Sequence, residues 1–499
     1  MLDSSGPETT EREAVGQNRG VRAAIIGGRV LTGVIGIAVG AAVIAAASLL
    51  ALPSVVNSPA SISVTPVPTS QQLVCPGSVL RLGDESGENA SSASAIGAPI
   101  ATHAATEGAV TATELDTPDA GGSATGHPTL LTVVDAAASV SIAGAQSQSV
   151  DTGDYTGFSA AECAQPSSDT WLVGGSTATG RTTLLTIANP GKGVSTVTIE
   201  IASETGLVEA PGTNGIVVGP NSQRVLSLAG FAPSFESVAV HVTSRGGPVV
   251  ANLQQSIVRG IEAGGTDIVG VTKAPSKLNV VPGVVVLGAE ALEGRLGEDG
   301  YKDLTPVLRA WVPGTTAAKG TVNIIPESPD LIGASFSVTL DPGVVTDIPI
   351  EGIADGSYTV TVVTDEPVVA AVRASTVAAV ASGKVDAGAS DFAWYASATT
   401  LSNAAFASVA SGPGVGLHLS NPTDADATVT ITGSDATETS VVVPAGSSIV
   451  AKVSGGRSYR LDGAGGLYAS VGYSGAAKLA TYLLGASATQ QQPVVISPY

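Results

Sequence analysis

Two cysteines, Cys75 and Cys163, are the residues of this 499-residue chain best suited to a covalent role. A redox-active pair more typically stands in a Cys-x-x-Cys motif. A lipid-modified Cys75 would need an apolar stretch directly before it, where the chain has Gln71 and Gln72. We therefore predict a structural disulfide. It would close a loop of about 90 residues, contribute about 4–5 kcal/mol in a chain-entropy model, and indicate an oxidising compartment.

Three tryptophans, Trp171, Trp311 and Trp394, are the candidates for stacking on a ligand such as a sugar. Trp171 and Trp394 lie near boundaries between expected folding units, and Trp311 ends an expected strand. Packing within a core or between units is the commoner fate of such scarce residues. Both interpretations therefore stay open for these three rings.

The chain shows no constellation typical of catalysis. It has no Gly-x-Ser-x-Gly elbow, no Gly-x-x-x-x-Gly-Lys-Ser/Thr loop and no His-Glu-x-x-His motif. Asp424 and Asp426 pair two carboxylates, but they follow an Asn-Pro turn, where acids commonly act as turn formers. We expect no catalytic residue, no metal site and no cofactor, and therefore not an enzyme. The net charge of −20 excludes nucleic acid as a partner.

An internal repeat after residue 171 is the strongest pattern in the sequence. Four blocks recur three times in the same order; the first reads TTLLTIANP at 182–190, LTPVLRAWVP at 304–313 and VGLHLSNP at 415–422. Each block holds one or two strands with Val, Ile and Thr at alternate positions, separated by turn residues. The third and fourth blocks each predict a hairpin.

The repeat predicts an all-β fold: tandem antiparallel immunoglobulin-like β-sandwiches after one N-terminal transmembrane helix. Before the repeats, we expect strands at 78–82, 129–135 and 139–144 and a long mobile insertion over 83–127. The folded units expected outside the membrane are a disulfide-closed β domain at 71–165 and three sandwich repeats at 166–275, 276–390 and 391–499.

The repeats also align Thr186, Arg309 and His418 at one position, and His241 with Thr361. Since the residue type changes between copies, the fold does not require these histidines. We expect them to be exposed surface residues without a shared partner.

Residues 30–52 form a run of 23 uncharged residues, long enough for a membrane-spanning helix. Arg19, Arg22 and Arg29 lie just before it, and the next basic residue is Arg81. The positive-inside bias predicts a single-pass protein of the cell membrane, with residues 1–29 cytoplasmic and the bulk extracytoplasmic. A cleaved signal peptide is the alternative, although its apolar region would be shorter.

Two features flank or interrupt this span. Gly36 and Gly40 form a Gly-x-x-x-Gly pattern, which allows weak self-association of the helix. Residues 53–70 are rich in Pro, Ser and Thr and read as a semi-rigid spacer between the membrane and the first folded unit.

Several short motifs carry a resemblance to known sequences. They are LVCPG at 73–77, WLVGG at 171–175 shortly after Cys163, RTTLL at 181–185, Asn189-Pro190 and AVHVT at 239–243. With the N-terminal anchor, the chain resembles an uncharacterised family, a domain of unknown function, of actinobacterial single-pass envelope proteins. The resemblance implies a secreted, membrane-tethered β protein, and it implies no activity, catalytic residue or cofactor.

We expect a non-enzymatic, membrane-anchored extracytoplasmic scaffold, adhesion or partner-binding protein of the cell envelope. Its partner would be an envelope protein or a glycan. The alternative is a carbohydrate- or peptidoglycan-binding accessory protein for envelope assembly. Because the predicted strands carry few charges, a strand from a partner protein could pair with an exposed edge of a sheet.

Overall fold

The computed structural model describes residues 62–64, 70–83, 92–120, 125–134, 140–298, 300–378, 389–485 and 494–496. These residues are mostly strand, which confirms the all-β prediction. Their helices are short: α2 (Ala289–Arg295) and the 3-10 turns η1 (Leu228–Gly230) and η2 (Lys302–Leu304). In this part of the chain no helix is long and apolar enough to cross a membrane. The predicted tail at 1–29 and span at 30–52, with Gly36 and Gly40, lie outside the described residues.

The chain divides into two bodies, residues 1–64 with 493–499 and residues 65–492. In the first, β1 (Ile62–Val64) pairs antiparallel with β34 (Val494–Ile496).

The second body contains four β-sandwiches, of which the one at 169–269 shows the full strand pattern. One sheet has the order β10–β16–β12–β13, with β14 also paired to β12, and the other has the order β15–β11–β17–β18. Alternating Val197, Ile199 and Ile201 point into the core between the sheets, while Thr196 and Glu200 face solvent. The strands of this second sandwich are β10 (Asp169–Val173), β11 (Arg181–Asn189), β12 (Ser195–Ser203), β13 (Gly206–Val208), β14 (Ile216–Val218), β15 (Ser222–Ser227), β16 (Val238–Arg245), β17 (Val250–Arg259) and β18 (Glu262–Val269).

The third sandwich repeats this order with one long strand in place of two. β24 pairs with β19 and β21 through its first half and with β20 and β25 through its second half. The orders are therefore β19–β24–β21–β22 and β23–β20–β24–β25. Its strands are β19 (Ser276–Val286), β20 (Val307–Trp311), β21 (Ala318–Pro326), β22 (Ala334–Leu340), β23 (Val345–Pro349), β24 (Gly356–Val377) and β25 (Ser390–Ala396).

The fourth sandwich has the orders β26–β31–β28–β29 and β30–β27–β32–β33, again the same pattern. Its core lies between the two sheets. Its strands are β26 (Ala404–Val409), β27 (Gly416–Ser420), β28 (Ala427–Gly433), β29 (Glu438–Val443), β30 (Ser448–Lys452), β31 (Arg457–Asp462), β32 (Tyr468–Gly475) and β33 (Lys478–Leu483).

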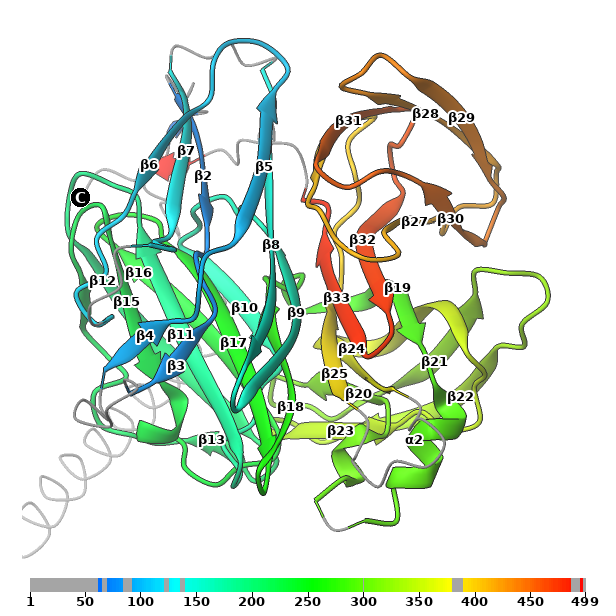
Figure 1. Cartoon of the computed structure of the whole chain (residues 1–499), viewed down its shortest axis with the longest axis horizontal. Helices are drawn as coiled ribbons and strands as arrows, with labels where there is room; N and C mark the ends of the chain where they lie inside the picture. Colours follow the sequence, from blue (N-terminus) through cyan, green and yellow to red (C-terminus); the bar gives the residue numbers. More distant parts are fainter. Residues whose placement is uncertain are drawn as a thin grey trace, which may run out of the picture. The chain divides into compact units, whose positions relative to one another are not determined.

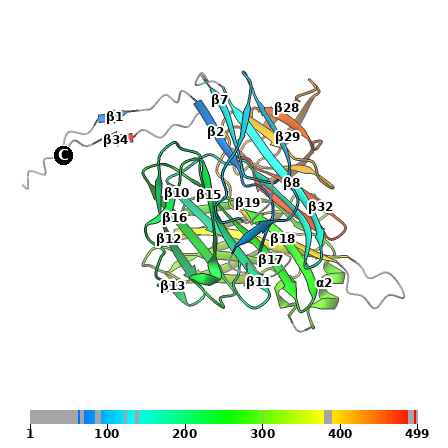
Figure 2. The same cartoon turned by 60° about the vertical axis from the view of Figure 1, so that its left-hand side comes forward.

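The first sandwich, at 70–162, has a reduced form of the pattern, with three strands in each main sheet. The orders are β2–β7–β6 and β5–β8–β9, and a separate hairpin, β3–β4, follows β2 (Figure 1). Figure 2 shows β2, β7 and β8 of this sandwich from another side. Its strands are β2 (Ser70–Cys75), β3 (Leu80–Leu82), β4 (Ala93–Ala95), β5 (Ile100–Ala105), β6 (Thr111–Glu114), β7 (Thr129–Val134), β8 (Ile142–Thr152) and β9 (Tyr155–Glu162).

Three expectations need correction or refinement. The third and fourth blocks are not hairpins, because their two halves pair in different sheets; β14 joins β12, whereas β15 joins β11. A strand-turn-strand pattern cannot distinguish these two outcomes. The expected insertion at 83–127 contains strands β4, β5 and β6. The immunoglobulin-like arrangement is not confirmed, since the first two strands of each sandwich lie in different sheets, whereas strands A and B share one in that fold.

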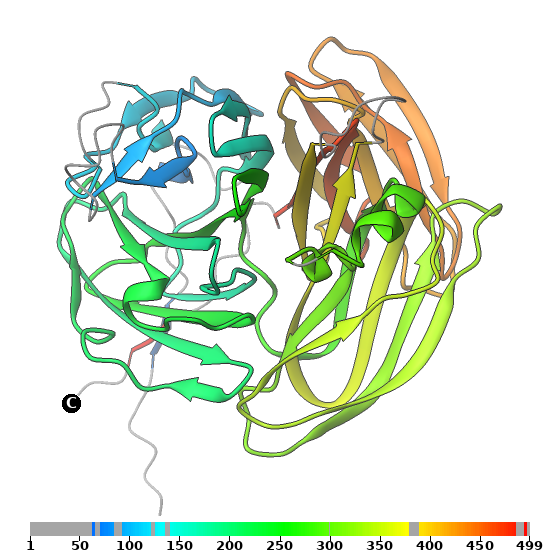
Figure 3. The ribbon, with the colours of Figure 1, turned by 60° about the horizontal axis from the view of Figure 1, so that its bottom comes forward.

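The last strands of the four sandwiches meet along one axis. β9 contacts β18, β18 contacts β25, β25 contacts β33, and β33 contacts β9 again. Figures 1 and 3 show the four sandwiches arranged around these strands. The first and fourth sandwiches therefore also touch, through bonds such as Ser147 Oγ–H to the Ser411 carbonyl (2.5 Å). We call this arrangement the ring.

Candidate functional site

Asp391 lies on β25, one of the four strands at the centre of the ring. Its carboxyl group accepts a hydrogen bond from each of the other three strands. Its Oδ2 accepts hydrogen bonds from the backbone N–H groups of Phe158 on β9 (2.9 Å) and Leu479 on β33 (3.2 Å). Its Oδ1 accepts one from Thr266 on β18 (3.3 Å). Burial raises the pKa of Asp391 well above its usual value. The sandwiches are thus tied together by one buried carboxyl group.

Glycines leave room for this carboxyl group. A Cβ added at Gly157 on β9, or at Gly265 on β18, would lie 2.6 Å from Asp391 Oδ1. Both glycines also have positive φ angles, 133° and 111°, which other residues rarely adopt. Asp267 on β18 adds a second buried carboxyl group, whose Oδ2 accepts the Trp394 backbone N–H at 2.7 Å. Burial raises the pKa of Asp267 to about 7.

A cavity of about 340 Å³ opens where the four central strands end. Each strand contributes its carboxyl end or the residues just after it: Glu162 for β9, Thr272 for β18, Ser397 for β25 and Leu484 for β33. We call it the axial cavity. Its volume lies in the range of small-molecule sites, and no single sandwich could form it.

The axial cavity has two inward charges of opposite sign. Glu162 is partly buried, and burial raises the pKa of its carboxyl group to about 7, which a hydrogen bond from the Gly485 backbone offsets only in part. Lys273 Nζ donates to the Leu278 carbonyl at 3.0 Å, and burial lowers the pKa of Lys273. Asp169 is a third charged residue that lines the cavity, and its Oδ2 lies 3.4 Å from Nε2 of His241.

The structure separates the three tryptophans. Trp171 lines the axial cavity, but its ring stacks on His241 at 3.8 Å between centroids and 11° between planes. Trp311 and Trp394 are 1% and 2% exposed and belong to the core of the second and third sandwiches. Because the rings of Trp311 and Trp394 are covered by other side chains, Trp171 is the one of the three that could still stack on a ligand. The ring centroids of Trp171 and Trp311 are 5.2 Å apart.

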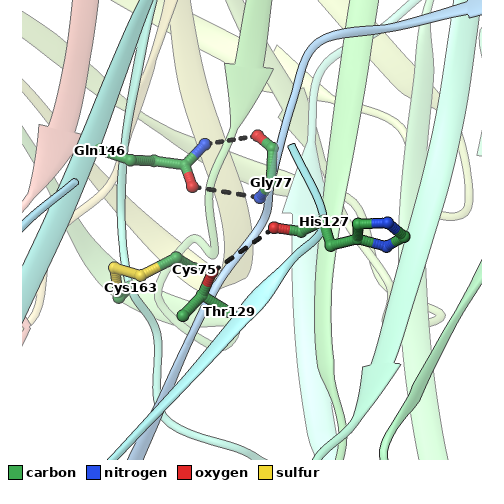
Figure 4. Close-up of a disulfide and its surroundings, with 6 residues drawn as sticks. All are labelled: Cys75, Gly77, His127, Thr129, Gln146 and Cys163. Carbon is green, nitrogen blue, oxygen red and sulfur yellow. Dashed lines mark hydrogen bonds between the residues drawn. A yellow bond between two sulfur atoms is a disulfide. The ribbon is translucent and has the colours of Figure 1, made fainter. Parts of the chain in front are cut away.

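The predicted disulfide is confirmed: Cys75 on β2 is bonded to Cys163, which directly follows β9. Figure 4 shows it beside Gln146, whose side-chain amide exchanges two hydrogen bonds with the Gly77 backbone (2.6 and 3.1 Å). Cys163 also lines the axial cavity. The disulfide therefore fixes one wall of the cavity to the first sandwich.

The aligned position 186, 309 and 418 is not an exposed surface position, as the sequence had suggested. Arg309 is 1% exposed and forms a bidentate pair with Asp347 (2.7 and 2.8 Å). It also donates to the Gly175 and Val238 carbonyls of the second sandwich.

His418, at the same aligned position, is 3% exposed, and its Nδ1 lies 2.6 Å from Glu327 Oε2 of the third sandwich. Arg309 and His418 thus each lie between their own sandwich and the preceding one, whereas Thr186, which is also buried, bonds to the Asn252 carbonyl of its own sandwich. Alternation along a strand identifies opposite faces but cannot show that a neighbouring sandwich covers the outer one.

A second candidate site is the outer edge of β5. In the other sandwiches the counterparts of β5 are β11, β20 and β27, and each pairs on its outer side with a further strand, β15, β23 or β30. Among the described residues, β5 pairs only with β8. β20 and β27 are buried along their whole length, whereas β5 is largely exposed and Ile100 is 64% exposed.

Comparison with known protein families identifies one family for most of the chain. Residues 115–454 match the model of a family of unknown function, DUF5719. The match covers more than half of the chain, from the end of β6 to just after β30, and the protein belongs to this family. No curated protein and no solved structure matches the chain.

Proposed function

We propose that this protein is a non-enzymatic, membrane-tethered component of the cell envelope whose ring lies outside the cytoplasmic membrane and binds a partner protein. Residues 30–52 are the proposed tether and 53–70 the proposed spacer. A buried disulfide in the first sandwich supports an oxidising compartment. The observation that carries partner binding is the outer edge of β5, which has no paired strand among the residues that the structure describes.

The three sister sandwiches indicate what the β5 edge lacks. Each adds an outer strand of five or six residues to the strand that corresponds to β5. The first sandwich has the same inner strands in the same order, so a segment from a partner protein could take the fourth place in its sheet. Such β-augmentation gives affinity through main-chain hydrogen bonds.

β5 also differs from the outer strands of the sister sandwiches in the residues that protect a sheet edge from further pairing. The outer strands of the sister sandwiches carry a charge or a proline, the devices that discourage further strand pairing: Arg224 in β15, Asp347 and Pro349 in β23, Lys452 in β30. β5 has the sequence IATHAA, without Lys, Arg, Asp, Glu or Pro. An exposed, unprotected edge is suited to pairing with another chain.

Crosslinking in intact cells tests this proposal. A photoreactive residue at His103 on β5 should capture one envelope protein, whereas the same residue at Val450 on the protected strand β30 should capture none. Lysine at Ala101, an exposed position, should abolish capture from His103 without lowering the thermal unfolding temperature. Equal capture from both strands, or capture that survives the Ala101→Lys change, would contradict partner binding at β5.

The glycan-binding alternative depends on Trp171. The stacked His241 ring covers one face of that side chain. We therefore do not extend the proposal to glycans.

A further inference from the structure

We propose that the axial cavity binds a zwitterionic amino acid or short peptide, with the ligand's ammonium group at Glu162 and its carboxylate at Lys273. This site is separate from the β5 edge, and it holds whether or not a partner strand binds there. It goes beyond partner binding because it assigns a small-molecule ligand to the centre of the ring.

The construction of the cavity favours a dedicated site. All four sandwiches contribute walls, through Glu162, Thr272, Ser397 and Leu484 at the ends of the central strands. Asp391 and its three backbone donors hold the same four strands together. The walls are therefore positioned before any ligand arrives, which lowers the entropic cost of binding. A volume of about 340 Å³ suits a ligand of amino-acid to dipeptide size.

The charges of the cavity select the ligand class. Glu162 and Lys273 line the same cavity, but in the described part of the chain they are not paired with each other, and Lys273 Nζ donates to the Leu278 carbonyl. The pKa of each group is shifted toward the neutral form by burial and not by the other group. Both side chains are half-buried, so a ligand that displaces water from the cavity imposes a desolvation cost on each charge, and a counter-charge on the ligand offsets that cost. Asp169 is already beside His241.

A ligand with one ammonium and one carboxylate group supplies both missing counter-charges at once. An amine alone would leave Lys273 without a partner, and a carboxylate alone would leave Glu162 without one. A neutral ligand would help neither group. Leu73, Ile142, Phe406 and Leu484 also line the cavity and provide apolar wall for an aliphatic side chain. Leucine-like amino acids or short apolar peptides fit these requirements.

Calorimetric titration of the full chain tests the proposal with four probes. L-leucine and L-leucyl-L-leucine carry both charges; 3-methylbutylamine and 4-methylpentanoate are leucine without its carboxylate and without its ammonium group. We expect at least one of the two zwitterions to bind about tenfold or more tightly than either fragment. The comparison of the two zwitterions shows whether a free amino acid or a peptide fits better.

Two substitutions assign the ends of the ligand. Glu162→Gln should weaken leucine and 3-methylbutylamine by about tenfold and leave 4-methylpentanoate unchanged, while Lys273→Met should do the reverse. Glu114→Gln and Lys192→Met, at exposed positions outside the cavity, are the matched controls and should change nothing.

Three results would overturn the proposal: neither zwitterion binds at millimolar concentration, a fragment binds as tightly as the better zwitterion, or both cavity variants keep the affinity of the wild-type chain. The comparison of probes uses the unaltered protein, so a variant that fails to fold does not weaken the test.

Discussion

Replacing Asp391 by alanine is the sharpest perturbation of the ring. The carboxyl group accepts three backbone hydrogen bonds, one from each of the other central strands. Alanine leaves all three N–H groups without their acceptor at a site where Asp391 itself is fully buried. Each orphaned buried donor costs about 1–3 kcal/mol. Removing the carboxyl group also removes its own desolvation cost, so we expect a loss near the lower end, about 3 kcal/mol in all.

Urea unfolding of the full chain at neutral pH measures this loss as the change in the free energy of unfolding. Asp365→Ala is the matched control, because Asp365 is exposed and accepts a single backbone bond, from Lys319 at 2.6 Å. It should cost no more than about 1 kcal/mol. If Asp391→Ala is no more destabilising than Asp365→Ala, the role of Asp391 as the link between the central strands is wrong.

Three further predictions concern the interfaces, the buried acids and the disulfide. Arg309→Met should destabilise the chain by about 3–5 kcal/mol in urea unfolding, because it removes the counter-charge of Asp347 and the hydrogen bonds to three backbone carbonyls; adding Asp347→Leu should recover part of that loss. Because the pKa of Asp267 is raised to about 7, the folded state holds a proton that the unfolded state has released; stability should therefore fall as pH rises from about 4 to 7, and Asp267→Asn should flatten that fall in thermal unfolding. Reduction of Cys75–Cys163 should cost about 4–5 kcal/mol, measured as a lower unfolding midpoint with reductant, and a Cys75→Ser/Cys163→Ser double variant should not respond to reductant.

The strands and their order of recurrence could be predicted from the sequence because each block has its own period-2 pattern. Block one, for example, became β11, β20 and β27, three strands with the same neighbours in their sheets. The pairing of the cysteines could be predicted because only one intramolecular pairing exists. These features depend on residues close in sequence or on composition alone.

The ring could not be predicted in this way, since it depends on contacts between residues far apart in the sequence. Asp391 stands in a short buried strand and looks like an ordinary acid near a loop; its three partners come from residues 158, 266 and 479. Glu162 and Lys273 share a cavity although 111 positions separate them. The one available signal was the aligned position of Thr186, Arg309 and His418, at which Arg309 and His418 contact different neighbouring sandwiches.

Closure of the ring between its first and last sandwiches is the claim on which the axial cavity and the role of Asp391 depend. Cysteines introduced at Ser149 on β8 and Lys478 on β33, whose side chains are joined by a 2.8 Å hydrogen bond although they are 329 positions apart, test it directly. A short bis-maleimide should join the two introduced cysteines in the full chain, seen as faster migration on a denaturing gel, while it should not join Ser149→Cys to Lys452→Cys on the outer strand β30. A folded Ser149→Cys/Lys478→Cys variant whose two introduced thiols each react with N-ethylmaleimide but form no crosslink would contradict a closed ring.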